Sequence, residues 1–99
     1  MKTLREPAEV AAYAAAVVRR HVPDPAYRVF LFGSRAAGTA HPRSDIDIGI
    51  EGPRPVPHET MALIADELDE APTLYTVDVV DFARLPDTFR RVARHRVPL

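Results

Sequence analysis

Residue types that would point to particular classes of protein are absent or scarce in this chain of 99 residues. It has no cysteine, which excludes a disulfide framework, a thiol nucleophile and a zinc site built on cysteine. Thirteen basic and fourteen acidic residues leave a net charge of −1, so no overall positive field attracts nucleic acid, although a local basic patch stays open. The longest apolar stretch, residues 10–18, is too short to span a bilayer, and the chain opens without a signal-type apolar run. We therefore expect a cytoplasmic protein whose residues 1–99 form one domain.

Prolines and hydrophobic patterning divide the chain into alternating helices and strands. Pro23 and Pro25 end the first apolar helical segment, and Pro72 ends a later one. The order of elements predicts a small α/β or α+β fold, in which helices cover a small mixed sheet. The expected helices are residues 7–20, a short turn of helix within 33–38, residues 58–70 and a segment from residue 85 onward, and the expected strands are residues 27–32, 44–51 and 74–80.

Two segments carry more detailed expectations about packing. The loop over residues 52–57 holds three prolines, and we interpret it as a tight connection rather than as a mobile flap over a site. Helical spacing predicts a buried stripe on the helix over residues 58–70, and inward-facing side chains near the end of the chain. The stripe consists of Met61, Leu63, Ile64 and Leu68, and the inward-facing side chains are Phe89, Val92 and Val97.

A turn that follows a strand and begins with Gly33 and Ser34 is the first feature with chemical potential. Glycine lets the backbone approach a ligand closely and adopt dihedral angles that other residues avoid. We expect Ser34 to cap the short helix that follows, whose free N–H groups suit a phosphate. Arg35 either adds positive charge to such a site or is simply solvated. Most turns of this kind are plain helix caps, so the turn alone is weak support for a function.

Aspartates on two predicted strands are the second feature. In the strand over residues 44–51, alternation places Asp45 and Asp47 on one face and three isoleucines on the other face, which is core. Two like charges so close together cost stability unless a cation lies between them, and carboxylate oxygens suit Mg²⁺. Asp78 alternates with valines in the same way on the next strand, whereas Asp81 has the opposite parity and is predicted to be a turn or cap residue. A half-solvated strand is the alternative interpretation for each aspartate taken alone.

Together these segments resemble the minimal nucleotidyltransferase family of the polymerase-β superfamily. The pattern of that family is Gly-Ser, a short spacer with glycine, Asp-x-Asp and a third aspartate on a later strand. In this chain it corresponds to Gly33 and Ser34, then Asp45 and Asp47, then Asp78. The resemblance covers essentially the whole chain and implies a polymerase-β-like nucleotidyltransferase fold.

The resemblance also implies a role for each matching residue. Asp45 and Asp47 are then ligands of two Mg²⁺ ions, and Asp78 is a third carboxylate that binds the catalytic metal and helps to deprotonate the attacking hydroxyl. Gly33 and Ser34 correspond to the turn that grips the β- and γ-phosphates of ATP. The full set of expected nucleotide-binding residues is Gly33, Ser34, Arg35 and Ser44.

In function, the resemblance implies an antitoxin. Family members of this size typically pair with a HEPN-domain toxin, and some transfer AMP from ATP to a tyrosine of that toxin. The rest of the chain only completes the predicted sheet and its helices, so we expect a separate protein to supply the acceptor. The sequence is compatible with either a homo-oligomer or a hetero-oligomer. Two alternatives remain: a catalytically silent antitoxin that masks the toxin by binding, and a nucleotidyltransferase for a small-molecule alcohol. The complete set of Gly-Ser and three aspartates favours activity over masking.

The remaining charged residues receive simpler interpretations. The four histidines are scattered without the spacing of metal ligands, and we expect them at the surface. His41 lies between the turn and the aspartate pair, where a role in the loop is favoured over a nucleotide contact. A basic run near the end of the chain is expected to form a solvated face, with a contact to an acidic partner or RNA as the minority alternative. The run consists of Arg90, Arg91, Arg94 and Arg96.

Overall fold

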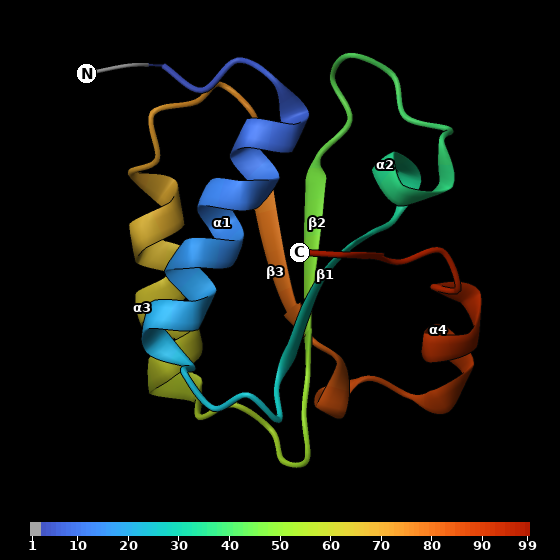
Figure 1. Cartoon of the computed structure of the whole chain (residues 1–99). Helices are drawn as coiled ribbons and strands as arrows, with labels where there is room; N and C mark the ends of the chain where they lie inside the picture. Colours follow the sequence, from blue (N-terminus) through green and yellow to red (C-terminus); the bar gives the residue numbers. More distant parts are fainter. Residues whose placement is uncertain (1–2) are drawn as a thin grey trace.

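A mixed four-stranded sheet, in the order β3-β2-β1-β4, runs through the middle of the molecule (Figure 1). This computed structural model describes residues 3–99, apart from the side chains of Arg91 and Val92. The central strands β1 and β2 are antiparallel, β3 pairs parallel with β2, and β4 pairs antiparallel with β1. The strands are β1 (Arg28–Phe32), β2 (Ile46–Glu51), β3 (Val77–Asp81) and β4 (Val97–Pro98).

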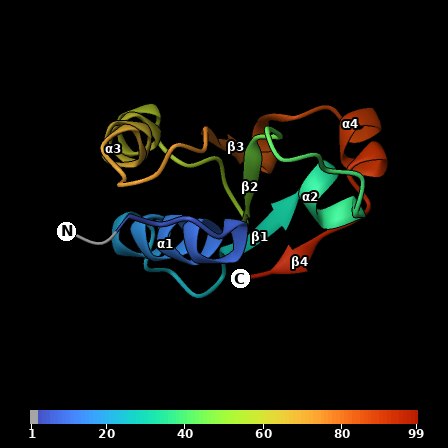
Figure 2. The same cartoon turned by 90° about the horizontal axis from the view of Figure 1, so that it is seen from above.

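The predicted helical cover is present, and it extends over both faces of this sheet. Helices α1 and α3 lie on one side, and α2 and α4 lie on the other (Figure 2). Within residues 3–99, no helix is long and apolar enough to cross a membrane. The helical elements are α1 (Pro7–His21), α2 (Ser34–Ala37), α3 (His58–Asp69), the 3₁₀ turn η1 (Phe82–Arg84) and α4 (Asp87–Val92).

The face of the sheet toward α1 and α3 forms the main apolar core. Ile46, Ile48 and Ile50 of β2 are completely buried there, and they pack with the alanine- and valine-rich face of α1. Burial of an isoleucine contributes about 1.5–3 kcal/mol, so this face supplies a large part of the stability. The predicted alternation is confirmed for the isoleucines, and it directs Asp47 to the opposite face.

A cluster of phenylalanines fills part of that opposite face. Phe30, Phe32 and Phe82 are buried together, with the rings of Phe30 and Phe82 in an edge-to-face arrangement at 4.9 Å. Gly49 of β2 lies beneath them, and a Cβ atom at this position would come within 2.3 Å of the Phe30 ring. Arg96 closes the cluster, because its guanidinium lies 4.5 Å from the centre of the Phe30 ring.

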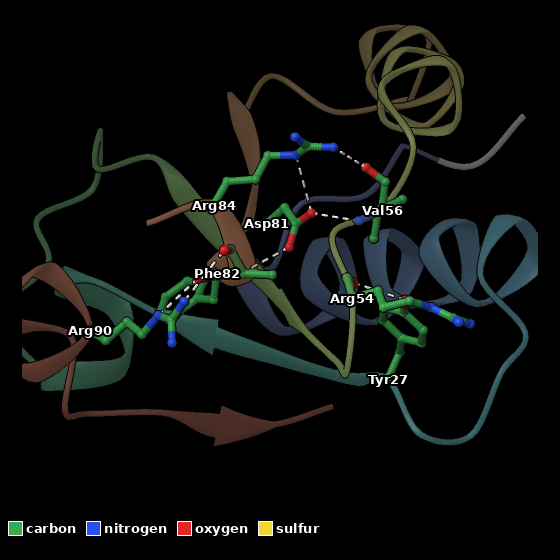
Figure 3. Close-up of polar contacts among 8 residues, drawn as sticks. Tyr27, Arg54, Val56, Asp81, Phe82, Arg84 and Arg90 are labelled. Carbon is green, nitrogen blue, oxygen red and sulfur yellow. Dashed lines mark hydrogen bonds and ion pairs between the residues drawn. The ribbon is translucent and has the colours of Figure 1, made fainter. Parts of the chain in front are cut away.

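The proline-rich loop over residues 52–57 is tied to the sheet (Figure 3). Val56 is buried, its N–H donates to Asp81 Oδ2 at 2.7 Å, and its carbonyl accepts from Arg84 at 2.6 Å. The other carboxylate oxygen of Asp81 accepts from the N–H of Ala83 at 3.0 Å, at the start of η1. The interpretation as a connection is therefore confirmed, as is the prediction that Asp81 is a cap residue.

Two strands begin two or three residues later than predicted. β2 begins at Ile46 rather than at residue 44, because residues 41–44 form a turn in which the N–H of Ser44 donates to the carbonyl of His41 at 2.9 Å. β3 begins at Val77 rather than at residue 74, and the preceding Leu74 is completely exposed. Asp45 consequently lies just before β2 and not within it.

Some apolar side chains predicted to face inward do not. Leu63 is 55% exposed, because α3 packs mainly through Ile64 and Leu68. Phe89 is 43% exposed, and its ring lies edge-to-face to that of Phe82, with the ring centres 6.3 Å apart. Val97 belongs to the short strand β4 instead of a helix and is 44% exposed. The corresponding prediction for Val92 falls on a side chain outside the described residues.

The basic run near the end of the chain is not a uniformly solvated face. Arg90 Nε donates to the carbonyl of Phe82 at 2.9 Å. Arg96 pairs with Glu51 at 2.9 Å while stacking on the phenylalanine cluster. These arginines attach the C-terminal segment to the sheet, so the expectation of a solvated face is wrong for them. Arg91 has a side chain outside the described residues.

Candidate active site

Asp47 and Asp78 come from neighbouring strands and lie side by side. They are register partners in the parallel pair of β2 and β3. Since residues paired in register point to the same side of a sheet, both carboxylates lie on the face away from the isoleucine core. Both line one cavity of about 640 Å³. The sheet thus brings together two acids that are 31 residues apart in the chain.

The glycine turn directly adjoins this pair. Gly33 has φ of +75°, a conformation that side chains other than glycine rarely adopt. A Cβ atom at Gly33 would lie 2.2 Å from Asp47 Oδ2, so only glycine lets the turn approach the carboxylate this closely. Ser34 follows in the wall of the same cavity. The expectation that Ser34 caps α2 is wrong, because the helix begins one residue earlier than expected and Gly33 occupies the cap position.

Most lining residues of the cavity were not predicted as site residues from the sequence, and among them are Thr39, Phe89 and His95. Thr39 follows α2, Phe89 belongs to α4, and His95 lies between α4 and β4. The last two reach the cavity because the chain folds back to add β4 beside β1. Strand β4 has only two residues, too few to show the alternating pattern of a strand. The sequence therefore did not predict that the C-terminal segment folds back beside β1. His95 was expected at the surface, and it is exposed at the mouth of this cavity.

Arg35 and Ser44 lie outside the lining of the cavity and hold the loop that leads to β2. Arg35 donates to the carbonyl of Ser44 at 3.0 Å and to that of His41 at 3.3 Å. Its guanidinium also lies 5.0 Å from the centre of the Tyr75 ring. Ser44 Oγ accepts from the N–H of His41 at 3.0 Å. His41 therefore has the role in the loop that the sequence favoured.

Electrostatics link all three aspartates. The pKa of Asp47 is raised above its usual value of 3.8, first by burial, then by the negative charge of Asp78 and then by that of Asp45. Asp45 is exposed at the end of the loop before β2 and is not part of the cavity wall. Its carboxylate nevertheless contributes to the same negative field.

The donor set suits a hard cation such as Mg²⁺, which prefers carboxylate oxygens. A divalent ion beside Asp47 would offset the repulsion that raises the pKa of this residue. Within residues 3–99, no three acidic or histidine side chains already surround a single point at ligand spacing. The arrangement therefore offers Asp47 and Asp78 as a pair, with Asp45 as an exposed carboxylate nearby. Beside the glycine turn, such a pair can hold a cation together with a phosphorylated ligand.

Comparison with known proteins places this geometry in context. Residues 23–96 match the family model described as polymerase beta, nucleotidyltransferase. The chain is also 30% identical over 86 residues to the probable protein adenylyltransferase MntA of Haemophilus influenzae, and the match covers 87% of this chain and 74% of that protein.

Crystal structures of toxin–antitoxin complexes share the fold. A variant of the MntA–HpeT complex aligns with a TM-score of 0.66 at 22% identity, over 89% of this chain and 70% of that chain. A toxin–antitoxin structure with AMP-PNP aligns with a TM-score of 0.59 at 23% identity, over 87% and 69%. The complex of tri-AMPylated Shewanella oneidensis HEPN toxin with MNT antitoxin aligns with a TM-score of 0.61 at 17% identity, over 94% and 71%. The predicted architecture, a small mixed sheet with helical cover, is thereby confirmed.

Proposed function

Because the chain belongs to the polymerase-β nucleotidyltransferase family, we propose that it is a protein adenylyltransferase that acts as an antitoxin. Its substrates are ATP and a hydroxyl group, a tyrosine, on a partner toxin of the HEPN class. The H. influenzae relative is a probable protein adenylyltransferase, and one structure of the same fold holds a tri-AMPylated HEPN toxin. The partner and the reaction are carried over from these proteins.

One observation within this chain carries the proposal. The Gly33 turn, Ser34, Asp47 and Asp78 share the wall of one cavity. A surface that only masks a toxin has no need of two repelling carboxylates beside a closely approaching glycine turn, since like charges held together cost stability. A site that binds a metal–nucleotide complex requires them. The arrangement thus favours a working enzyme over a silent antitoxin.

The proposed reaction is an in-line substitution at the α-phosphorus of ATP. The acceptor oxygen forms the new P–O bond, the bond from the α-phosphorus to the bridging oxygen breaks, and pyrophosphate leaves. Asp78 takes the proton of the attacking hydroxyl. Asp45, Asp47 and Asp78 would hold two Mg²⁺ ions, which supply positive charge for the oxygens that enter and leave.

Other residues of the chain bind and position the nucleotide. The backbone of Gly33 and the hydroxyl of Ser34 face the β- and γ-phosphates. Arg35 and Ser44 act on the nucleotide through the loop over residues 39–45, which their hydrogen bonds hold against α2. Preorganised groups of this kind accelerate phosphoryl transfer mainly by positioning and charge.

Transfer of label from ATP tests the proposal. The chain is incubated with Mg²⁺, ATP labelled at the α-phosphate and the HEPN-domain protein encoded beside its gene. We expect label on a tyrosine of that protein, located by mass spectrometry, and an increment of one or more AMP units. Asp47→Asn and Asp78→Asn should each lower the rate by at least about 100-fold, since each removes a charge that acts in the transition state. Asp66→Asn, on an exposed acid of α3, is the matched control and should transfer label normally.

Each alternative predicts a different result in the same experiment. A silent antitoxin neutralises the toxin without transfer of label, and Asp47→Asn leaves that neutralisation intact. An enzyme for small molecules labels an added alcohol and leaves the HEPN protein unlabelled. Either result would contradict the proposal.

A further inference from the structure

A second cavity lies at the end of the sheet where β2 and β3 begin. Its volume is about 750 Å³, and it is lined by residues 3–5, 42–43 and 74–76. These three segments meet at the top of Figure 1, where the N–H of Leu4 donates to the carbonyl of Pro72 at 2.8 Å. We call this cavity the Leu74 groove. It shares no lining residue with the cavity that holds Asp47 and Asp78.

The lining of the Leu74 groove combines apolar surface with positive charge. Leu74 is 100% exposed, which is unusual for a leucine. Arg5 and Arg43 are exposed beside it, and no acidic side chain occurs among the described residues of the lining. A third guanidinium, that of Arg35, stacks at 5.0 Å on the ring of Tyr75. An apolar side chain between cations is a composition typical of an interaction surface.

The side chains that line the groove indicate which kind of ligand it binds. The guanidinium groups attract and orient carboxylates. The exposed side chain of Leu74 gains free energy only by covering another apolar group. A protein segment with acidic and apolar side chains supplies both partners, whereas a nucleic acid offers phosphates and leaves Leu74 without an apolar contact. The groove therefore favours an acidic protein segment over RNA.

The Leu74 groove also adjoins the proposed catalytic residues along the chain. Arg43 precedes Asp45 by two residues. The carbonyl of Thr76 accepts from the N–H of Ile46 at 2.9 Å, and Thr76 precedes Asp78 by two residues. A protein held in the groove thus has part of its surface at the start of the strands that carry the aspartates.

We propose that the Leu74 groove docks an acidic, partly apolar segment of the protein that accepts AMP, and so positions its acceptor hydroxyl. This inference rests on the proposed function. It adds a docking surface that lies outside the catalytic cavity and contributes to affinity for the protein substrate rather than for ATP.

Two substitutions of exposed residues test the groove. Leu74→Asp places a negative charge on its apolar part, and Arg5→Glu reverses one cation on a different segment, outside the loop over residues 39–45. We expect each to raise the Kd for the HEPN-domain protein, measured by calorimetry, and the KM for AMP transfer by at least about tenfold, or about 1.4 kcal/mol. The value of kcat and the affinity for AMP-PNP should stay unchanged. Leu63→Asp, on the exposed leucine of α3, is the matched control and should alter none of these quantities.

Salt dependence provides a second measurement. Binding of the HEPN-domain protein to the unaltered chain should weaken as ionic strength rises, and Arg5→Glu should flatten that dependence. Leu74→Asp should lower the affinity at every salt concentration.

Other outcomes would overturn the inference. Normal Kd and KM in both groove variants would do so, as would an equal loss in Leu63→Asp. A chain that dimerises by itself, and becomes monomeric only in Leu74→Asp, would assign the groove to a second copy. Loss of binding to a single-stranded RNA probe, with normal binding to the HEPN-domain protein, would assign it to RNA. If the HEPN-domain protein binds but receives no AMP, the proposed function fails while the Kd comparison still decides the role of the groove.

Discussion

Asp47 and Asp78 are register partners on adjacent parallel strands, so their carboxylates lie on the same side of the sheet. Burial and the charges of Asp78 and Asp45 raise the pKa of Asp47. Without a cation, the folded chain therefore holds negative charges closer together than the unfolded chain does. The site has an electrostatic cost that a bound cation can offset.

The first prediction concerns the pH dependence of stability. Because the pKa of Asp47 is raised in the folded state, the folded chain binds this proton more tightly than the unfolded chain. By linkage, the contribution of Asp47 is most favourable below the unfolded pKa and is lost as pH rises through the folded pKa. The Asp47→Asn variant has no ionisable group at this position, so its stability does not decrease in this way as pH rises. In EDTA, its Tm relative to that of the unaltered chain should therefore increase from acidic to neutral pH.

Thermal unfolding over a series of pH values checks this prediction. The difference in Tm between Asp47→Asn and the unaltered chain isolates the contribution of Asp47. Other groups, whose pKa is lowered in the folded state, change stability with pH in the opposite direction. One of these is Glu67, whose pKa is lowered mainly by its hydrogen bond with His21. Asp66→Asn, at an exposed acid, should leave the pH profile unchanged. A difference in Tm that does not vary with pH would contradict the assignment.

The second prediction concerns Mg²⁺. A ligand that binds only the folded state stabilises it by RT ln(1 + [L]/Kd), or about 2.7 kcal/mol at a concentration of 100 times Kd. For a domain of this size this corresponds to a rise in Tm of about 10–20 °C. Calorimetry with and without Mg²⁺ should show such a rise for the unaltered chain, and Asp47→Asn and Asp78→Asn should reduce it strongly. An equal rise in all three proteins would place the cation elsewhere.

A pair of glycine substitutions gives the third prediction. Gly33 and Gly38 both have positive φ, +75° and +78°, so alanine introduces backbone strain at either position. The cost is about 1–2 kcal/mol at Gly38, in the left-handed region, and about 1–3 kcal/mol at Gly33, whose ψ of −156° is adopted almost only by glycine. Only at Gly33 does the new Cβ atom collide with Asp47, whereas at Gly38 it meets nothing within 4 Å. Gly33→Ala should therefore lower the rate of AMP transfer at least about tenfold, and Gly38→Ala should affect stability alone. Steady-state kinetics below both Tm values distinguish the two; equal rates would contradict the close approach.

The fourth prediction tests the polar network that ties the proline-rich loop. Asp81 is 4% exposed and accepts from the N–H groups of Val56 and Ala83. Asp81→Ala leaves the N–H groups of Val56 and Ala83 without their acceptor and removes the carboxylate that pairs with Arg84 at 3.4 Å, which should cost about 2–4 kcal/mol. Asp87→Ala, in an ion pair whose aspartate side chain is 81% exposed, should cost less than about 1 kcal/mol. Urea denaturation compares the two, and a similar midpoint for both would refute the structural role of Asp81.

The local pattern of the sequence was sufficient for much of the site. Alternation in β2 placed three isoleucines in the core, and the same period required Asp47 to point the other way. The glycine at position 33 predicted a turn with dihedral angles that other residues avoid, and its φ is +75°. Such features depend on residues near in sequence, so the pattern alone contains them.

Other features depended on contacts between distant segments. The sequence gives Leu63 the same apolar character as Ile64, and only the angle at which α3 packs decides that Leu63 stays exposed. Arg96 was expected to be solvated because arginine is charged. In the structure it stacks on the phenylalanine cluster and pairs with Glu51. The exposure of Leu74 likewise follows from where β3 begins.

By itself, the sequence determined the order of the main helices and strands, the apolar face of β2 and the residue types of the candidate site, because hydrophobic periodicity and glycine stereochemistry act over a few residues. Only the tertiary structure decided that Asp47 and Asp78 are neighbours, that His95 returns to their cavity and that Arg5 and Arg43 line one cavity with Leu74. Strand register and chain return are set by the packing of segments far apart in the chain, and the free energy of that packing is a property of the whole fold.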